Sequence, residues 1–508
     1  MVATSATATA LPGRPQRLAQ RRSHRLRSWL AFDERPQLIE LAMTPAGRIA
    51  LFACFGALLC FALPVRFALP VHWAILVLAG CAAAAFLREH RDRAVLLATL
   101  GTLLFDPTWY GDPSFDAYLE QLHPGGWLSL RNWQRLATAG LFVCAALGLR
   151  HVARHPKTWF ARHPVLCLLG GLCAATLLAS SLSTPPLWLV LAIKLTGVYL
   201  WFMCYAVADQ RSAQRSSLAF SLGLFRPFWG SSSTPLGKGA GYLAKLRCDE
   251  PYELASLQLK ALKLLAWSVV LSLLSWSVSA GSARLGIPEL AVALRAFAEG
   301  HPVHAGIGWC AIVTSVAVAA LELAVWGHRV VACARLAGWK LRRNTWRPLA
   351  SRSLADFWNR YYFYFKELLL DFFFYPTFFR LFKKHARLRT FCATFMAAGV
   401  GNALYHFVRD SDRVLSLGPA QALQGFGSYA FYCFALASGI ALSQLRTDAR
   451  SARRQEQSGF FAAISFAWSF ACVWGTVCCL HVFGGVEDRT IPFGARFAFL
   501  LHQLGVNP

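Results

Sequence analysis

Residues 356–376 read DFWNRYYFYFKELLLDFFFYP, and residues 399–410, a little further on, read GVGNALYHFVRD. The first segment is mostly aromatic or apolar, although five charged residues interrupt it: Asp356, Arg360, Lys366, Glu367 and Asp371. The second is an apolar segment with one histidine, His406. A titratable side chain inside an apolar helix is costly unless it pairs or faces a polar cavity. The two segments therefore predict helices of a membrane domain, and they make His406 a candidate functional residue.

The composition of the whole chain indicates the same class. Of its 508 residues, 56% are hydrophobic and 14% are aromatic, and the mean hydropathy is +0.42. Soluble domains of this length do not carry so much apolar surface, and many of the apolar runs are long enough to cross a bilayer. We expect an all-α polytopic membrane protein with about eleven transmembrane helices and additional re-entrant or interfacial helices. The expected spans are 49–65, 67–86, 94–105, 132–149, 165–182, 187–208, 261–280, 304–327, 390–408, 421–444 and 459–484.

Basic residues concentrate in alternate connections between these runs, which predicts a cytoplasmic N-terminus by the positive-inside rule. The expected organisation is a basic cytoplasmic tail over 1–45, one transmembrane domain over 46–486 and a short C-terminal tail over 487–508. The net charge of +26 fits cytoplasmic loops that face anionic membrane lipids. The chain has no nucleic-acid-binding motif, so nucleic acid is not an expected partner.

Two segments are predicted not to cross the membrane, the first as a re-entrant or surface-lying segment and the second as helices that dip into the membrane domain. Residues 218–259 contain prolines, serines and glycines and no span-length apolar run, so protein must shelter their backbone. Their GKGAG sequence lacks the spacing of a phosphate-binding loop. Residues 357–380 are expected to form one or two helices at the cytoplasmic rim, where Arg360 can pair with Asp356 four residues earlier.

The region 353–410 resembles the membrane-bound O-acyltransferase family, in particular the bacterial branch that O-acetylates alginate or D-alanylates teichoic acid. Seven residues fall on matching positions of the family block: Asp356, Phe357, Trp358, Arg360, Asp371, Phe372 and Phe374. His406 occupies the place of the family's histidine in the following helix. The chain departs from the family at Tyr362, where the family has histidine or asparagine, and at Phe407, where it has glycine.

The resemblance implies an acyltransferase that moves an acyl group from a thioester to a hydroxyl of an envelope glycan, a lipid or a small molecule. His406 would act as the general base, since neutral imidazole accepts a proton near neutral pH. Tyr362 or Asn402, with Asn359 as a weaker candidate, would donate a hydrogen bond to the oxyanion. Asn402 and Asp410 lie one turn before and one turn after His406, so a regular helix would place all three on one face.

No bound cofactor or metal is expected, and the acyl donor would be acyl-CoA or an acyl carrier protein. Both donors are anionic, and the basic clusters at 329–347 and 380–389 would attract them. These clusters have an equally weighted alternative role, which is to set topology and contact phospholipid. The fifteen cysteines are scattered through apolar runs and predict no disulfide framework. Cys392 is an alternative covalent nucleophile, but packing is its favoured role.

Two other classes of function remain open. A non-enzymatic relative of the same fold could serve as a scaffold with envelope-assembly partner proteins, and Tyr362 favours this alternative. A transporter is supported only by the number of spans, because Lys194 and Glu322 are the clear charged residues deep inside them. Abundant alanine and arginine indicate a bacterial source and hence the cytoplasmic membrane.

Overall fold

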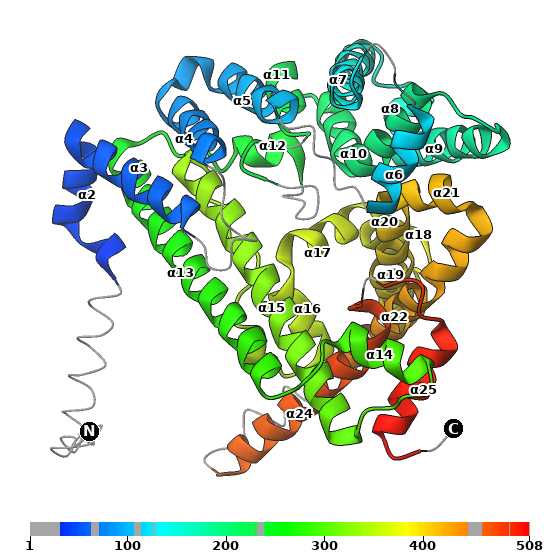
Figure 1. Cartoon of the computed structure of the whole chain (residues 1–508). Helices are drawn as coiled ribbons and strands as arrows, with labels where there is room; N and C mark the ends of the chain where they lie inside the picture. The colour runs from blue at the N-terminus through cyan, green and yellow to red at the C-terminus, as the bar shows by residue number, and fades with distance from the viewer. Residues whose placement is uncertain are drawn as a thin grey trace, which may run out of the picture.

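A computed structural model of the chain describes residues 31–61, 71–105, 113–123, 125, 128–225, 227–230, 238–445, 460–486 and 488–506. Every regular element within these ranges is a helix, and their one β-contact is an isolated bridge between Arg247 and Trp339. Figure 1 shows the helices arranged around the long pair α13 and α15, with α17 near the centre. The predicted all-α class is confirmed.

Eight helices in the described ranges are long and apolar enough to cross a membrane. They are α7 (Leu130–Arg154), α9 (Pro164–Ser181), α10 (Leu187–Arg211), α13 (Pro251–Arg284), α15 (Ala305–Leu336), the continuous run of α19 (Ala386–Phe395), η6 (Met396–Gly401) and α20 (Asn402–Arg409), then α22 (Pro419–Leu445) and α24 (Phe460–Gly484). Each of them coincides with one of the spans expected from the sequence. The multi-pass architecture therefore follows from hydropathy alone.

The N-terminal region differs from the expected three spans. The helices α2 (Pro36–Met43) and α3 (Pro45–Cys60) meet at 99°, and α4 (Val71–Phe86) meets the segment of η3 (Arg88–His90) and α5 (Arg91–Phe105) at 109°. A helix of 15 residues such as α5 rises only about 22 Å, which is less than the hydrocarbon thickness. If each bent pair counts as one span, the described residues hold ten spans instead of eleven.

Several helices lie in segments for which the sequence predicted tails or connections. The helix α2 falls within the predicted tail 1–45 and packs against α13, whereas residues 1–30 of that tail lie outside the described residues. The predicted tail 487–508 contains α25 (Phe493–Gln503), whose Phe499 is fully buried against α14 (Leu290–Ala298) and α15. Short helices also form in other connections, namely α6 (Pro113–Leu122), α8 (Trp159–Arg162) and α21 (Ser411–Leu417).

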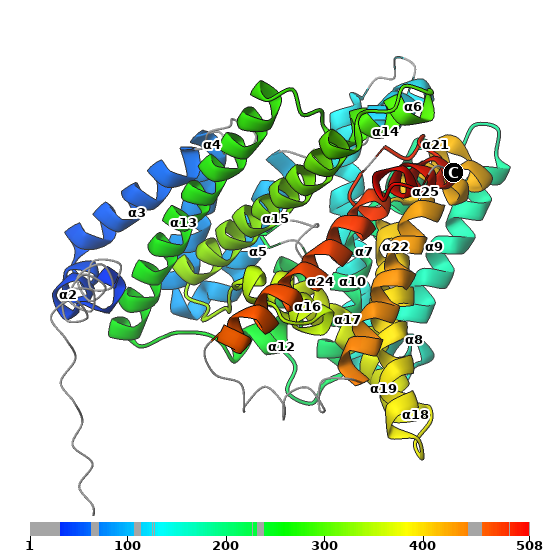
Figure 2. The ribbon, with the colours of Figure 1, turned by 90° about the horizontal axis from the view of Figure 1, so that it is seen from below.

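The two longest helices, α13 and α15, lie side by side, as Figures 1 and 2 both show. Glu250 caps the start of α13 by accepting hydrogen bonds from the backbone of Tyr252 and Glu253, and Pro251 occupies the first helical position. With 34 and 32 residues, these helices are about 50 Å long and extend beyond a hydrocarbon layer of about 30 Å. The C-terminal end of α15 and the connection after it therefore lie near a membrane boundary.

The proline- and glycine-rich part of the segment 218–259 forms two short helices among its described residues, α11 (Leu218–Gly223) and α12 (Gly239–Ala244), whereas residues 251–259 already belong to α13. Phe228 and Trp229 between them are buried, and Trp229 packs on Trp339 with ring centroids 4.7 Å apart. Protein thus shelters this irregular backbone, as predicted.

The block 353–380 forms α16 (Leu354–Tyr361), a break at Tyr362, and then α17 (Phe363–Leu369), η5 (Leu370–Phe374) and α18 (Tyr375–Arg380). None of these is among the candidate spans. Asn344 satisfies the backbone N–H groups at this break. Its backbone carbonyl accepts a hydrogen bond from Phe363 N, and its side-chain Oδ1 accepts one from Tyr364 N. The predicted pair forms, with Arg360 Nε 2.6 Å from Asp356 Oδ1.

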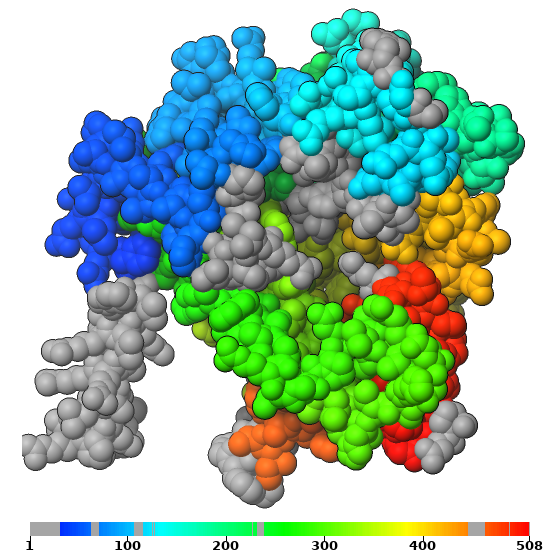
Figure 3. Space-filling model, viewed as in Figure 1, coloured from blue at the N-terminus to red at the C-terminus, as the bar shows by residue number. Residues whose placement is uncertain are grey.

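Many large apolar side chains face outward on the candidate spans. In the space-filling view, the green surface of α13, α14 and the start of α15 covers the lower front of the molecule (Figure 3). Ile307 and Val313 on α15 and Trp468 on α24 are among the exposed apolar residues. Such a surface fits contact with lipid tails instead of water.

Candidate functional site

His406 lies on α20, near the end of the helix that runs from Ala386 to Arg409. Its half-buried ring packs against Tyr429 of α22 and Phe365 of α17, with centroids 4.6 Å and 5.8 Å away. Within the described ranges, no side chain or backbone group forms a hydrogen bond with its ring nitrogens. In contrast, the intramembrane His481 on α24 shares a 2.9 Å hydrogen bond with Ser315 Oγ.

The other two predicted site residues lie in the same region. Asn402 is one helical turn before His406 and is buried, and its Oδ1 has no hydrogen-bond partner among the described residues. Tyr362, at the break between α16 and α17, packs on Phe365 with ring centroids 5.3 Å apart. Phe365 is therefore a shared contact of Tyr362 and His406. The fold thus links Tyr362 to His406 through Phe365, which the sequence did not mark, while Asn402 lies one turn from His406 on the same helical run.

Asp410 was predicted to lie on the same helix face as His406, one turn further on, but the helix ends just before it. The Asp410 carboxylate is held by Arg409 at 3.1 Å and by Arg489 at 2.8 Å. The Arg489 guanidinium also lies over the ring of Tyr429, 5.4 Å from its centroid. The positive charge of Arg489 is therefore separated from the imidazole by the Tyr429 ring, and the Asp410 carboxylate balances part of this charge.

Two π-helical segments meet beside this site. The first, η5, includes Asp371, and the second, η6, leads directly into Asn402. Gly401 makes their contact possible, because a Cβ at this position would lie 2.6 Å from the Phe373 ring. Such π-turns are rare and occur often at functional sites. A regular α-helix was expected here, and no pattern in the sequence marked either segment.

A polar cluster lies on the other side of η5. Lys238 Nζ is 2.6 Å from Glu367 Oε2, Lys366 Nζ is 3.0 Å from Glu367 Oε1, and Tyr205 Oη donates to Asp371 Oδ2 at 3.0 Å. We call these five residues the Lys238 cluster. The lysine of the GKGAG segment thus serves as a counter-ion for the aromatic block.

The pKa values of the two carboxyl groups of this cluster are shifted in opposite directions. Burial raises the pKa of Asp371, and the nearby charge of Glu367 adds to the increase, while Lys238 and Tyr205 oppose it. Burial alone would also raise the pKa of Glu367, but the hydrogen bonds from Lys238 and Lys366 outweigh burial and lower that pKa. Glu367 is therefore the more acidic of the two carboxyl groups.

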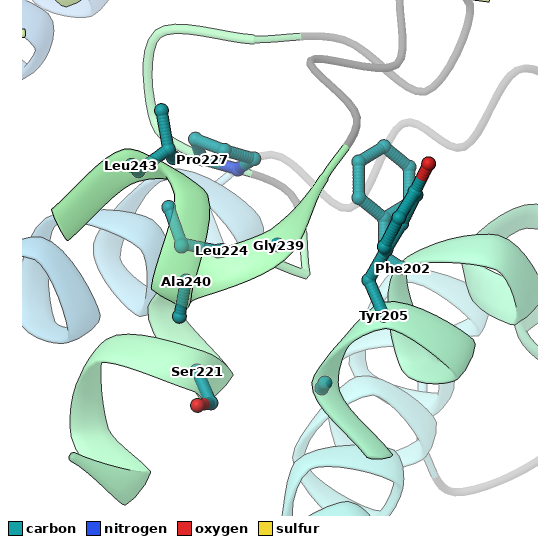
Figure 4. A pocket seen from close by; sticks show the side chains of 9 residues that line it. Phe202, Tyr205, Ser221, Leu224, Pro227, Gly239, Ala240 and Leu243 are labelled. Carbon is teal, nitrogen blue, oxygen red and sulfur yellow. The ribbon is translucent and has the colours of Figure 1, made fainter. Parts of the chain in front are cut away.

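A small cavity lies next to the Lys238 cluster, between α10, α11 and α12. Figure 4 shows Phe202 and Tyr205 of α10 on one side and Gly239 and Ala240 on the other. Its volume is about 20 Å³, which is room for about one water molecule. It is too small for a substrate.

A second cavity is much larger, about 1690 Å³, and lies between α13, α15, α24 and the connection 342–350. Asn359, Arg360 and Phe363 of the aromatic block line it. His406, Tyr362 and Asn402 are not among the described residues that line either cavity. The large cavity therefore touches the block on a different side from the imidazole.

The structure also contains a buried ion pair that the sequence did not predict. Lys194 Nζ on α10 lies 2.9 Å from Asp412 Oδ2 on α21, and both side chains are almost fully buried. The intramembrane lysine singled out in the sequence is thus neutralised by a partner in a short helix.

The sequence matches no protein-family model, and no curated protein matches it either.

Proposed function

We propose that the chain is a membrane-bound O-acyltransferase of a bacterial cytoplasmic membrane, with its N-terminus in the cytoplasm. It would transfer an acyl group from a thioester, acyl-CoA or acyl carrier protein, to a hydroxyl of an envelope glycan, a lipid or a small molecule. One observation carries this proposal: His406 sits in a membrane-spanning helix without a hydrogen-bond partner among the described residues. A titratable group inside an apolar helix is normally paired, so a half-buried imidazole without a partner among the described residues points to a role with a substrate.

The residues around His406 suit the reaction. The imidazole takes the proton of the acceptor hydroxyl, and the hydroxyl oxygen attacks the thioester carbonyl carbon. The oxyanion that forms needs a fixed donor, and the Asn402 amide and the Tyr362 phenol are the nearest candidates. The carbon–sulfur bond then breaks, and the thiolate takes the proton from the imidazolium, so that an ester and a thiol leave.

The test is acyl transfer in membranes that contain the chain, with a radiolabelled acetyl or longer acyl thioester. His406→Ala should abolish transfer to membrane or soluble acceptors while the protein stays in the membrane. His481→Ala is the matched control, because this histidine is also intramembrane but is hydrogen-bonded to Ser315. Loss of activity in both variants, or in neither, would contradict the assignment.

A catalytically inactive scaffold is the second candidate. Tyr362 replaces a polar residue of the family block, and His406 is not among the described residues that line the large cavity. Under this proposal, no labelled product forms with any thioester. The wild-type chain would instead co-purify from mildly solubilised membranes with envelope-assembly proteins, and His406→Ala would leave that association unchanged.

A further inference from the structure

The large cavity has an apolar wall built from one face of α15. Its lining residues there recur every three or four positions, at Trp309, Val313, Val316, Ala320 and Ala324. Residues 309 and 324 are about 22 Å apart along the helix axis. Leu274 of α13 and Phe470 of α24 continue the wall on either side. This depth and polarity suit hydrocarbon chains.

The other end of the cavity is strongly cationic. Five arginines line it, and no aspartate or glutamate is present among its described lining residues. They are Arg335, Arg342, Arg343, Arg347 and Arg360. Only Arg360 has a carboxylate partner in the described part of the chain, which is Asp356.

The remaining arginines are available to an anion to different degrees. Arg342 and Arg347 contact aromatic rings, 6.0 Å from the Phe363 centroid and 5.0 Å from that of Trp346. Arg343 has neither an ion pair nor a hydrogen bond within the described residues. These three side chains are exposed at the mouth of the cavity. Below them, the buried Asn344 has an Nδ2 group without a partner in the described ranges.

Part of the apolar wall of the cavity is exposed at the outer surface of α13, α15 and α24. Leu274 is 48% exposed, Val313 is 53% exposed and Phe470 is 37% exposed, although all three line it. In Figure 2, α13, α15 and α24 lie next to one another as long parallel rods, so the exposed part of the wall follows the direction of the spans. A bilayer lipid could enter by lateral diffusion, whereas a soluble anion would not need the apolar wall.

We propose that this cavity binds an anionic phospholipid, with its phosphate at Arg342, Arg343 and Arg347 and its acyl chains along α15. The guanidinium groups match a phosphate in both charge and geometry. Their position at the end of α15 places them where a headgroup meets water. This inference does not depend on the proposed acyl transfer, because it uses neither His406 nor the two candidate oxyanion donors, and it assigns the basic residues of 329–347 to a lipid phosphate instead of the acyl donor.

The experiment measures lipid retention by the full-length protein with native mass spectrometry. Delipidated protein in detergent is titrated with dioleoylphosphatidylglycerol or, separately, with dioleoylphosphatidylcholine. We expect the anionic lipid to bind at least tenfold more tightly. The double variant Arg343→Gln/Arg347→Gln should lose this preference, whereas Arg380→Gln/Arg387→Gln, two exposed arginines outside the cavity, should keep it.

A second variant tests the apolar wall without changing the charge. Ala320→Trp should fill the chain-binding part and weaken retention of the anionic lipid, while an unchanged melting temperature establishes that the protein is folded. Equal binding of both lipids overturns the proposal, as does equal loss in the two arginine double variants. Displacement of the lipid by inorganic phosphate alone, or binding of palmitoyl-CoA but not of phosphatidylglycerol, also overturns it.

Discussion

The ring of His406 on α20 lies 4.6 Å, centroid to centroid, from the ring of Tyr429 on α22. This contact joins two membrane-spanning helices at the position where the candidate base is held. Tyr429 in turn lies under the guanidinium of Arg489, whose partner Asp410 ends α20. The Tyr429 ring therefore orients the imidazole, and the ion pair between Arg489 and Asp410 holds the Tyr429 ring in place.

Removing the Tyr429 ring should slow acyl transfer, because His406 would lose the contact that positions it. Tyr429→Phe keeps the ring, so we expect a transfer rate within about twofold of wild type. Tyr429→Ala removes the ring and should lower the rate by about 10- to 100-fold, since small misplacements of a reacting group have large effects. The measurement is initial rates in membranes with equal protein content. An equal loss in both variants would show that the hydroxyl, instead of the ring, matters.

The contact between the two π-helices depends on Gly401. Gly401→Ala places a methyl group 2.6 Å from Phe373 and should destabilise the protein by about 1–3 kcal/mol. Gly427→Ala on α22 is the matched control, because its Cβ would meet nothing within 4 Å. Detergent unfolding titrations of both variants check this. If Gly401→Ala is as stable as Gly427→Ala, the close packing of η5 on η6 is wrong.

The buried pair Lys194 and Asp412 predicts a strong asymmetry between single and double variants. Lys194→Met leaves the Asp412 carboxyl buried without its cation and should cost about 3–5 kcal/mol at neutral pH. The double variant Lys194→Met/Asp412→Leu should recover most of this loss, because no charge remains to be desolvated. Unfolding titrations of these two variants and the wild type measure both effects. A double variant no more stable than Lys194→Met would argue against a direct pair.

The Lys238 cluster predicts how stability changes in acid. The folded protein holds the pKa of Glu367 below its ordinary value of 4.5, so its ionised carboxylate contributes stability above about that pH. The contribution disappears as the pH falls further and Glu367 gains a proton. Glu367→Gln should therefore unfold at a lower temperature than wild type at pH 7, and the difference should shrink toward pH 3. A constant difference across this range would exclude the ionised pair with Lys238.

Much of the architecture was predictable because hydropathy is a local signal. Each of the eight long helices coincides with an apolar run, and the pair Arg360 and Asp356 followed from helical spacing. The sheltered segment around Trp229 was also expected, since proline and glycine interrupt its helices. The short length of the run 94–105 was evident from the sequence, but the bends in α2/α3 and α4/α5 were not, because an apolar run does not reveal whether its helix is straight.

The surroundings of the candidate site were predictable only in part. The assignment of His406, Asn402 and Tyr362 to a site stays a prediction, and Phe365, the shared contact of Tyr362 and His406, looked like one more apolar residue of the block. The contact between Lys238 and Glu367 joins segments far apart in sequence, and nothing local encodes it. The π-turns arise from tertiary packing at Gly401 and Phe373, which sequence periodicity does not report. The cationic cavity likewise depends on how α13, α15 and α24 assemble.

The most direct test of the central claim is the rate of acyl transfer by purified His406→Ala relative to wild type, with the same labelled thioester and acceptor. Removing a general base should lower the rate by about 10²–10⁴-fold while the unfolding transition stays near that of wild type. A transfer rate within about twofold of wild type, in a variant that is folded and inserted in the membrane, would contradict the catalytic role of His406.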